Sequence, residues 1–218
     1  DKNQSYVWLL LKLKKPSNMK FSFLIISLVL ISGFVGGVFA QQTITEKEYS
    51  QEEIMEMKDK AVLISTNSGS LMIQFFPEDA PDTVSNFLEL VESGYYDGIV
   101  FHRIIPNFMI QAGDPNTIGP DSDRDTWGQG GPGYNINEEF NTIQHDRGIV
   151  SMARSNHPDS AGSQFFIMHK DNNQLDGKYT VFGRLVPGLP HALDEIASLP
   201  TNNTNQPLDA SRATIIKA

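Results

Sequence analysis

The chain has 218 residues, of which 39% are hydrophobic, so it can form one domain with extra segments or two small domains. It contains no cysteine, which excludes disulfides, thiolate catalysis and cysteine-ligated zinc or iron–sulfur sites. The net charge of −9 divides into +4 for residues 1–40 and −13 for residues 41–218, and a body this acidic argues against nucleic acid as the main partner.

Residues 19–40 have the pattern of a targeting segment. After Met19 and a lysine come 19 uncharged, largely apolar residues, 21–39, and then an exit of small residues before Gln41. This order is typical of a cleaved signal peptide and predicts an exported protein that is periplasmic, secreted or membrane-anchored. An uncleaved membrane anchor is the alternative, because the apolar run is close to the minimum length of a membrane span. Residues 1–18 are expected to be an upstream extension that precedes the natural start.

Residues 41–60 are polar and highly charged. Ser50 followed by Glu53 fits a capping box, which would begin a short helix. The alternative, which the high charge favours, is a solvated linker between the targeting segment and a domain that covers residues 61–218.

The first part of this domain predicts a hairpin, a helix and two strands. Two β-rich runs flank the turn signal at residues 67–70. Apolar residues then recur at three- and four-residue spacing from Val84 to Val91, which predicts an amphipathic helix that ends near Gly94. The run FHRIIPNFMIQAGD, residues 101–114, predicts two short strands separated by a turn.

A long loop rich in Gly, Pro and Asp follows at residues 114–135, and loops of this length are usually functional or disordered. Its run from Asp121 to Asp125 is similar to the start of a calcium loop, but the required glycine and glutamate are missing, which indicates a solvated acidic loop. The rest of the chain predicts three strands, a short helix and a last strand: GIVSMA, SQFFIM, YTVFGRLV, GLPHALDEIASL and RATIIKA. This pattern predicts a closed antiparallel β-barrel with helices over its ends.

The sequence lacks the common motifs of covalent and metal-dependent catalysis. It has no zinc-protease motif, no nucleophile elbow and no glycine-rich phosphate loop with lysine, and none of its five histidines are paired at ligand spacing on a helix. We therefore predict neither a metal nor a cofactor. The unusual residue is Arg103, which lies in an apolar run without a carboxylate before Asp114, although an unpaired buried charge is costly.

Periodicity alone gives these residues structural interpretations. It would make Arg103 an ion-pair partner and Gln111 a polar residue on a strand face. It would place Phe108, Met109 and Phe166 in the barrel core.

Four blocks, FHRIIPNFMIQAGD, GIVSMARS, SQFFIM and LDGKYTVFGRL, resemble the signature blocks of the cyclophilin family of peptidyl-prolyl isomerases, in that family's order and spacing. The resemblance extends over residues 61–218, and the MARS…PDS block is more similar to prokaryotic members. It implies a closed eight-stranded antiparallel β-barrel capped by two α-helices. Family members usually continue a few residues beyond the position of Ala218, so we expect the chain to be truncated there.

The resemblance also implies a reaction and a site. The reaction is rotation about X–Pro bonds in proline-containing peptides and in unfolded or folding proteins, without a cofactor. Arg103 is implied as the catalytic donor to the twisted amide nitrogen, and Gln111 as the residue that orients it. The implied substrate-binding residues are Phe108, Met109, Gly128, Ala153, Arg154, Gln164, Phe166, Leu175 and Tyr179. Gln174 replaces a tryptophan of many eukaryotic members, which predicts weaker binding of cyclosporin.

Two classes of function therefore compete. The first is an exported prolyl isomerase, expected to be a monomer, that assists the folding of extracytoplasmic proteins. The alternative is a non-catalytic proline-peptide-binding module or folding chaperone on the same fold. A hydrolase lacks a candidate nucleophile. Residues 202–204 form an N-glycosylation sequon, which has meaning only in a host that glycosylates exported proteins.

Overall fold

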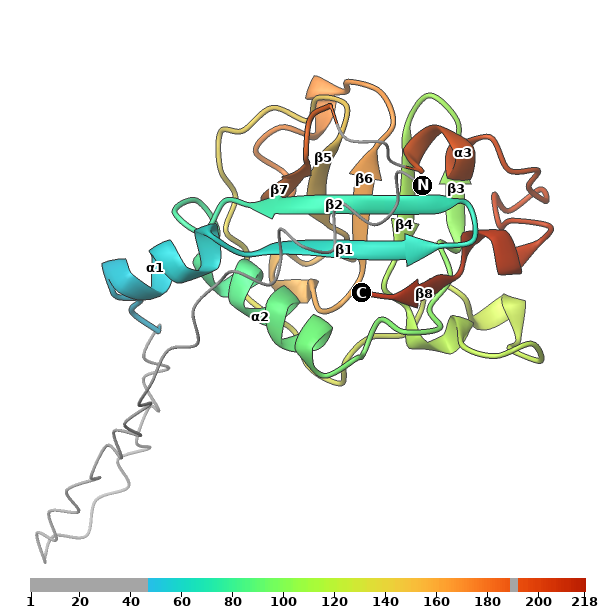
Figure 1. Ribbon diagram of the computed structural model, residues 1–218, viewed down its shortest axis with the longest axis horizontal. Helices are drawn as coiled ribbons and strands as arrows, with labels where there is room; N and C mark the ends of the chain where they lie inside the picture. The colour runs from blue at the N-terminus through green and yellow to red at the C-terminus, as the bar shows by residue number, and fades with distance from the viewer. Residues whose placement is uncertain (1–46, 189–191) are drawn as a thin grey trace, which may run out of the picture. The chain divides into compact units, whose positions relative to one another are not determined.

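Eight strands form one antiparallel sheet in the order β3-β4-β6-β5-β7-β2-β1-β8 in the computed structural model, which describes residues 47–188 and 192–218. The sheet curls strongly, so that β1 and β2 cross the direction of β4 and β6 (Figure 1). The predicted targeting segment lies outside the described residues. The strands are β1 (Ala61–Thr66), β2 (Gly69–Phe75), β3 (Arg103–Ile105), β4 (Met109–Ala112), β5 (Ile149–Met152), β6 (Phe165–Met168), β7 (Val181–Leu185) and β8 (Ile215–Lys217).

The two ends of this sheet are β3 and β8, and no strand ladder joins them within the described residues. The segment that precedes β3 nevertheless forms backbone hydrogen bonds with residues in and next to β8. The N–H of Gly98 donates to the carbonyl of Ile215 at 2.7 Å, and the N–H of Phe101 donates to the carbonyl of Ala213 at 2.9 Å. The predicted eight antiparallel strands are therefore confirmed, whereas full closure of the barrel stays a prediction.

The amphipathic helix predicted from periodicity is α2 (Pro81–Glu92). Proline suits the first position of a helix, where its missing N–H is not needed. The N-terminus is capped from far along the chain, because the carboxylate of Glu139 accepts the N–H groups of Asp82 and Thr83 at 3.0 and 2.8 Å. Burial of Glu139 raises the pKa of its carboxyl group. A tertiary contact thus fixes the start of this helix.

Phe87 on α2 is the centre of an aromatic cluster in the main core. Its side chain is fully buried. Its ring centroid lies 5.1 Å from Tyr96, 5.3 Å from Phe165, 5.1 Å from Phe182 and 5.8 Å from Phe75. The cluster joins α2 to β2, β6 and β7, so one side chain of the helix contacts three strands of the sheet.

A further helix, α1 (Gln51–Lys58), precedes the sheet. The hydroxyl of Ser50 accepts the N–H of Glu53, whose carboxylate accepts the N–H of Ser50 at 2.8 Å, so the capping box is formed. Ile54 and Met57 are buried against the main core. The structure therefore supports the helix rather than the solvated linker for residues 51–58.

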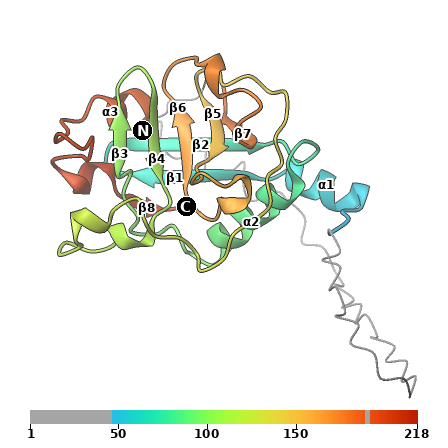
Figure 2. The same cartoon turned by 180° about the vertical axis from the view of Figure 1, so that it is seen from behind.

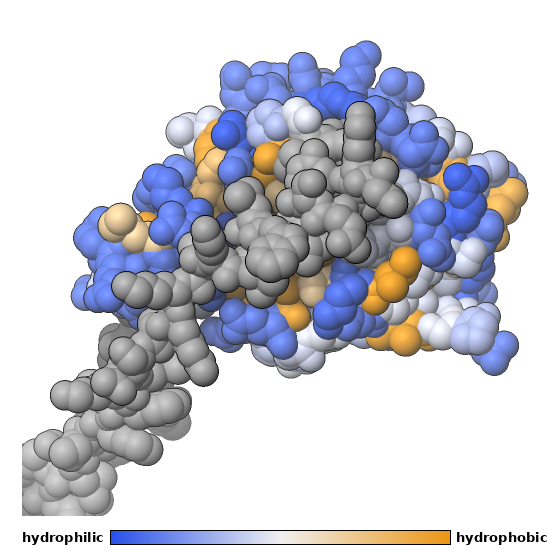
Figure 3. Space-filling view, in the orientation of Figure 1, coloured by the Kyte–Doolittle hydropathy of each residue, from blue (hydrophilic) through white to orange (hydrophobic). Residues whose placement is uncertain are grey.

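The short C-terminal helix, α3 (Leu193–Ala197), contacts β3 and β4, whereas α2 contacts β7. The two helices lie at opposite ends of the curled sheet in both views (Figures 1 and 2). A two-helix cap over a closed barrel stays a prediction. Among residues 47–188 and 192–218, no helix has the length and hydropathy needed to cross a bilayer. On the face drawn in Figure 3, hydrophilic residues cover most of the described surface, and apolar residues appear in small separate areas.

The strands near the centre of the sheet are apolar on both faces, and the two faces belong to different clusters. Successive residues of a strand point to opposite faces. On β6, Phe165 and Ile167 therefore join the main core, while Phe166 and Met168 join a second cluster. Met109 on β4 belongs to this second cluster, with Phe108, Leu175 and Tyr179 partly buried against it. Met109 and Phe166 are therefore buried, but they and Phe108 belong to the second cluster, on the face of the sheet opposite the main core.

Candidate active site

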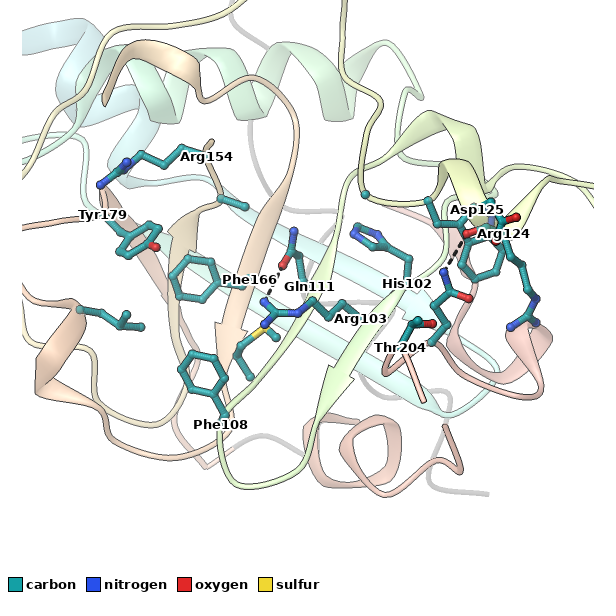
Figure 4. Close-up of a pocket in the computed structure, with 16 residues that line it drawn as sticks. His102, Arg103, Phe108, Gln111, Arg124, Asp125, Arg154, Phe166, Tyr179 and Thr204 are labelled. Carbon is teal, nitrogen blue, oxygen red and sulfur yellow. Dashed lines mark hydrogen bonds between the residues drawn. The ribbon is translucent and has the colours of Figure 1, made fainter. Parts of the chain in front are cut away.

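The strand register places Arg103, Gln111 and Phe166 in one row. Arg103 pairs with Gln111 between β3 and β4, and Gln111 pairs with Phe166 between β4 and β6. Residues directly opposite each other in antiparallel strands share a face of the sheet. The guanidinium of Arg103 points toward Gln111 and Phe166 (Figure 4). Three residues that are far apart in the sequence thus line the same surface.

The row lies in a groove with a volume of about 520 Å³. All substrate-binding and catalytic residues implied by the resemblance line this groove, except Gln164, which borders an adjacent cavity of about 530 Å³. The groove also has lining residues for which sequence reasoning gave no role in binding: His102, Arg124, Asp125, Trp127, Thr204 and Gln206.

A chain of amide hydrogen bonds holds Arg103 and Gln111. The Nη1 of Arg103 donates to Oε1 of Gln111 at 3.4 Å, and Nε2 of Gln111 donates to Oε1 of Gln164 at 2.9 Å. Gln164 in turn donates to the carbonyls of Gly128 and Gly130 at 3.0 and 2.8 Å. Because each amide has one donor end and one acceptor end, this chain turns the oxygen of Gln111 toward Arg103.

Arg103 itself is exposed and takes part in none of the ion pairs found among the described residues. Its interpretation as a structural ion-pair partner is therefore wrong. The open groove leaves the guanidinium hydrated, which removes the cost of an unpaired buried charge. Its remaining donors are available to a bound molecule.

An aromatic wall faces Arg103 across the groove. The rings of Phe166 and Tyr179 meet edge to face, with centroids 5.6 Å apart and an interplanar angle of 88°. Behind them, the buried ring of His145 stacks on Phe166 at 6.0 Å. The Nδ1 atom of His145 lies 2.9 Å from the carboxylate of Asp176. The wall is thus supported from the side that does not face the groove.

Arg154 holds the outer end of this wall. Its guanidinium lies 4.9 Å from the ring centroid of Tyr179, and its Nη2 donates to the carbonyl of Lys178 at 2.8 Å. Nη1 donates to the carbonyl of Ser155 at 3.0 Å. The side chain of Arg154 therefore makes its contacts with neighbouring residues. Both Arg154 and Ala153 line the groove.

The long loop predicted at residues 114–135 is ordered against the groove by Asp114. This carboxylate is fully buried and accepts the N–H groups of Asn116, at 2.8 Å, and of Gly128. Gly128 has φ +91°, a left-handed conformation that glycine adopts without strain. Gly128, which the resemblance implies as a substrate-binding residue, is among the residues that line the groove.

Two segments far apart in the sequence make the remaining wall. The guanidinium of Arg124 lies 4.6 Å from the ring centroid of Trp127, and its Nη1 donates to the carbonyl of Pro207 at 2.7 Å. Gln206 donates from Nε2 to the carbonyl of Arg124 at 2.8 Å. No motif or periodicity connects these segments, so the sequence offered no signal for this wall.

His102 is a buried histidine between Arg103 and this wall (Figure 4). Burial lowers the pKa of His102 to about 4, and the nearby Asp114 carboxylate opposes that effect only in part. Its ordinary pKa is about 6.5, so the ring is neutral in the folded protein near neutral pH. We interpret His102 as a structural rather than a catalytic residue.

The lowered pKa of His102 predicts a loss of stability in mild acid. Between about pH 6.5 and about pH 4, the unfolded chain binds a proton at this residue that the folded protein does not. We expect the free energy of unfolding to fall as the pH drops through this window, by about 3 kcal/mol from His102 alone. Urea unfolding at several pH values should show a smaller loss in His102→Gln than in the wild type. His157→Gln changes an exposed histidine and should keep the wild-type pH dependence. Equal losses in His102→Gln and the wild type would contradict the prediction.

Comparison with known proteins assigns this chain to a family. The family model described as cyclophilin type peptidyl-prolyl cis-trans isomerase/CLD matches residues 61–218. A peptidyl-prolyl cis-trans isomerase of Synechococcus elongatus is 44% identical over 122 residues, which cover 56% of this chain and 77% of the relative. A peptidyl-prolyl cis-trans isomerase-like 3 protein of Rhizopus delemar is 41% identical over 160 residues, which cover 70% of this chain and 90% of the relative.

The fold also matches a solved structure. A cyclophilin type isomerase of Cryptosporidium parvum, determined in the presence of the dipeptide Ala-Pro, superposes with a TM-score of 0.62 and 34% sequence identity. The match covers 73% of this chain and 99% of the other. Sequence and fold agree, and the chain belongs to the cyclophilin family of peptidyl-prolyl cis-trans isomerases.

Proposed function

We propose that the groove is the active site of the isomerase and that Arg103 stabilises the twisted amide of an X–Pro bond. The observation that carries this proposal is the exposed guanidinium of Arg103, held by Gln111 in the same row as Phe166. A positive donor therefore lies beside an apolar surface in an open groove. No nucleophile is required, because the reaction forms and breaks no covalent bond.

The physical problem is the resonance of the amide. Rotation about a peptide bond has a barrier of about 18–20 kcal/mol, and uncatalysed exchange at proline takes tens to hundreds of seconds. Catalysis requires that the groove bind the twisted amide more tightly than either planar form. The twisted nitrogen becomes pyramidal and gains a lone pair, to which Arg103 donates a hydrogen bond. Such a preorganised donor acts only where charge develops, so it favours the transition state over the ground state.

The other residues of the groove bind and orient the substrate. Phe108, Met109 and Phe166 offer an apolar surface of the second cluster to the proline ring. The backbone of Ala153 and Arg154 gives an extended peptide an edge to pair with. A proline-containing peptide as the ligand is supported by the Cryptosporidium parvum relative, whose structure was determined in the presence of Ala-Pro.

A protease-coupled assay with a proline peptide tests the catalytic function. The purified full-length chain should accelerate cis-to-trans exchange in proportion to its concentration. If it binds the peptide without accelerating exchange, the alternative of a non-catalytic proline-binding module or folding chaperone is correct.

Export is the second part of the proposal, and it rests on the pattern of residues 19–40 and the acidic body. We expect the mature protein to begin at Gln41, because small residues precede it at the end of an apolar segment. N-terminal sequencing of the protein isolated from its host measures this directly. A membrane-bound protein that retains residues 21–39 would instead identify an uncleaved anchor. A protein that retains them and remains in the cytosol would contradict export.

A further inference from the structure

The groove extends beyond Arg103 to the segments around Arg124 and Gln206. We call its lining residues Arg124, Asp125, Thr204 and Gln206 the far subsite. Figure 4 places Arg124, Asp125 and Thr204 on the side of His102 that is opposite Gln111 and Phe166. The row of Arg103 and the far subsite share one continuous groove, so a peptide bound with its proline at Phe166 can reach both.

The far subsite is preorganised by hydrogen bonds. The Oδ1 atom of Asn202 accepts the N–H and the hydroxyl of Thr204, at 3.0 and 2.8 Å, and the N–H of Gln206 at 2.9 Å. The Nδ2 of Asn202 donates to Oε1 of Gln206 at 3.0 Å. Gln206 donates a hydrogen bond to the carbonyl of Arg124, and the guanidinium of Arg124 donates one to the carbonyl of Pro207. The asparagine of the sequon is therefore the hub of a turn that forms one wall of the groove.

The far subsite contains one charged acceptor that no donor within the described residues occupies. The hydroxyl proton of Thr204 is donated to Asn202, and one of the two Nε2 protons of Gln206 is donated to the carbonyl of Arg124. The carboxylate of Asp125 is exposed, and no hydrogen bond or ion pair to it is found among the described residues. It lines the groove. A negative acceptor beside further oxygen acceptors complements a cation with several donors, such as an ammonium or a guanidinium group.

Neighbouring cations do not satisfy Asp125. The guanidinium of Arg124 stacks on Trp127 and donates to the carbonyls of Pro207 and Leu208. The guanidinium of Arg103 points the other way, toward Gln111 (Figure 4). The net charge of −13 over residues 41–218 adds a long-range attraction for cations.

We propose that the far subsite binds a lysine or arginine side chain next to the isomerised proline, through Asp125, and so gives the enzyme a preference for basic flanking residues. This inference rests on the proposed function, since it names a substrate class for the same groove. The interpretation of residues 121–125 as a purely solvated acidic loop changes accordingly, because Asp125 has a binding role there.

Exchange NMR on short peptides tests the preference without a coupling protease. The peptides carry alanine, lysine or glutamate on either side of a single proline. For the wild type we expect the ratio of kcat/KM for lysine to that for glutamate to be about two to five at the preferred position, in the range of a partly exposed ion pair. The ratio should approach one in Asp125→Asn, and high salt should lower it in the wild type. Asp125→Lys should invert the preference.

Asp121→Asn is the matched control, because it removes the same charge from the same loop at an exposed residue that does not line the groove. Its ratio should equal that of the wild type. Equal rates for lysine and glutamate peptides in the wild type would overturn the far subsite, as would an equal effect of Asp121→Asn and Asp125→Asn. The alanine peptide distinguishes a failure of the proposed isomerase function from a failure of the far subsite. If the wild type fails to isomerise it, the proposed function fails; if it does so without a basic preference, only the far subsite fails.

Discussion

Replacement of Arg103 by alanine should lower kcat/KM for X–Pro rotation by about 100- to 1,000-fold, the loss that follows removal of one preorganised donor from a transition state. The guanidinium is exposed and forms one side-chain hydrogen bond, to Gln111, so its removal should leave the fold intact. The effect should appear mainly in kcat, because the apolar surface at Phe166 that binds the proline ring remains. A protease-coupled assay or exchange NMR measures the rate.

Two further variants make this result specific. Arg103→Lys keeps the charge but replaces the fork of donors by a single ammonium group, so it should recover only part of the activity. Arg212→Ala removes an exposed arginine that does not line the groove, and its activity should equal that of the wild type. Equal activity of Arg103→Ala and the wild type would show that the mechanism is wrong.

Replacement of Phe87 by alanine should lower the free energy of unfolding by about 3–5 kcal/mol, the usual cost of deleting a fully buried phenylalanine. The change leaves a cavity between four aromatic rings, of which three lie on strands of the sheet and one, Tyr96, lies in the segment after α2. This loss is a large fraction of the stability of an ordinary domain. Urea unfolding followed by circular dichroism measures it.

Val91→Ala serves as the control on the same helix. Val91 is only partly buried, so this variant should lose clearly less stability than Phe87→Ala. Similar losses for the two variants would contradict the central role of Phe87. They would indicate instead that the core collapses around the missing ring.

The sequence predicted the helices and strands better than the tertiary contacts that stabilise them. The period of α2 was readable because its apolar stripe repeats every three to four residues. The helix α1 was not favoured from sequence, since an isolated helix of this length is marginal in water and its stability comes from the burial of Ile54 and Met57. Its capping box was the correct signal.

The site was predictable only through its family. On β6 every residue is buried, so the period of two cannot tell that Phe166 faces a groove while Phe165 faces the core. The row of Arg103, Gln111 and Phe166 depends on the register of three strands. The far subsite depends on contacts between Arg124 and Gln206, across a large separation in the chain. Local patterns contain no information about either.

The pairing of β1 with β8 has a consequence for folding during synthesis and translocation. Ser65 and Thr66, at the beginning of the domain, pair with Lys217 and Ile215, at its end. A chain that leaves the ribosome or a translocation pore with its N-terminus first therefore cannot complete the sheet until these last residues have emerged. Until then β1 has an unpaired edge, and unpaired edges promote association with other chains. Deletion of β8 should thus leave the newly made domain with this unpaired edge and prone to aggregation.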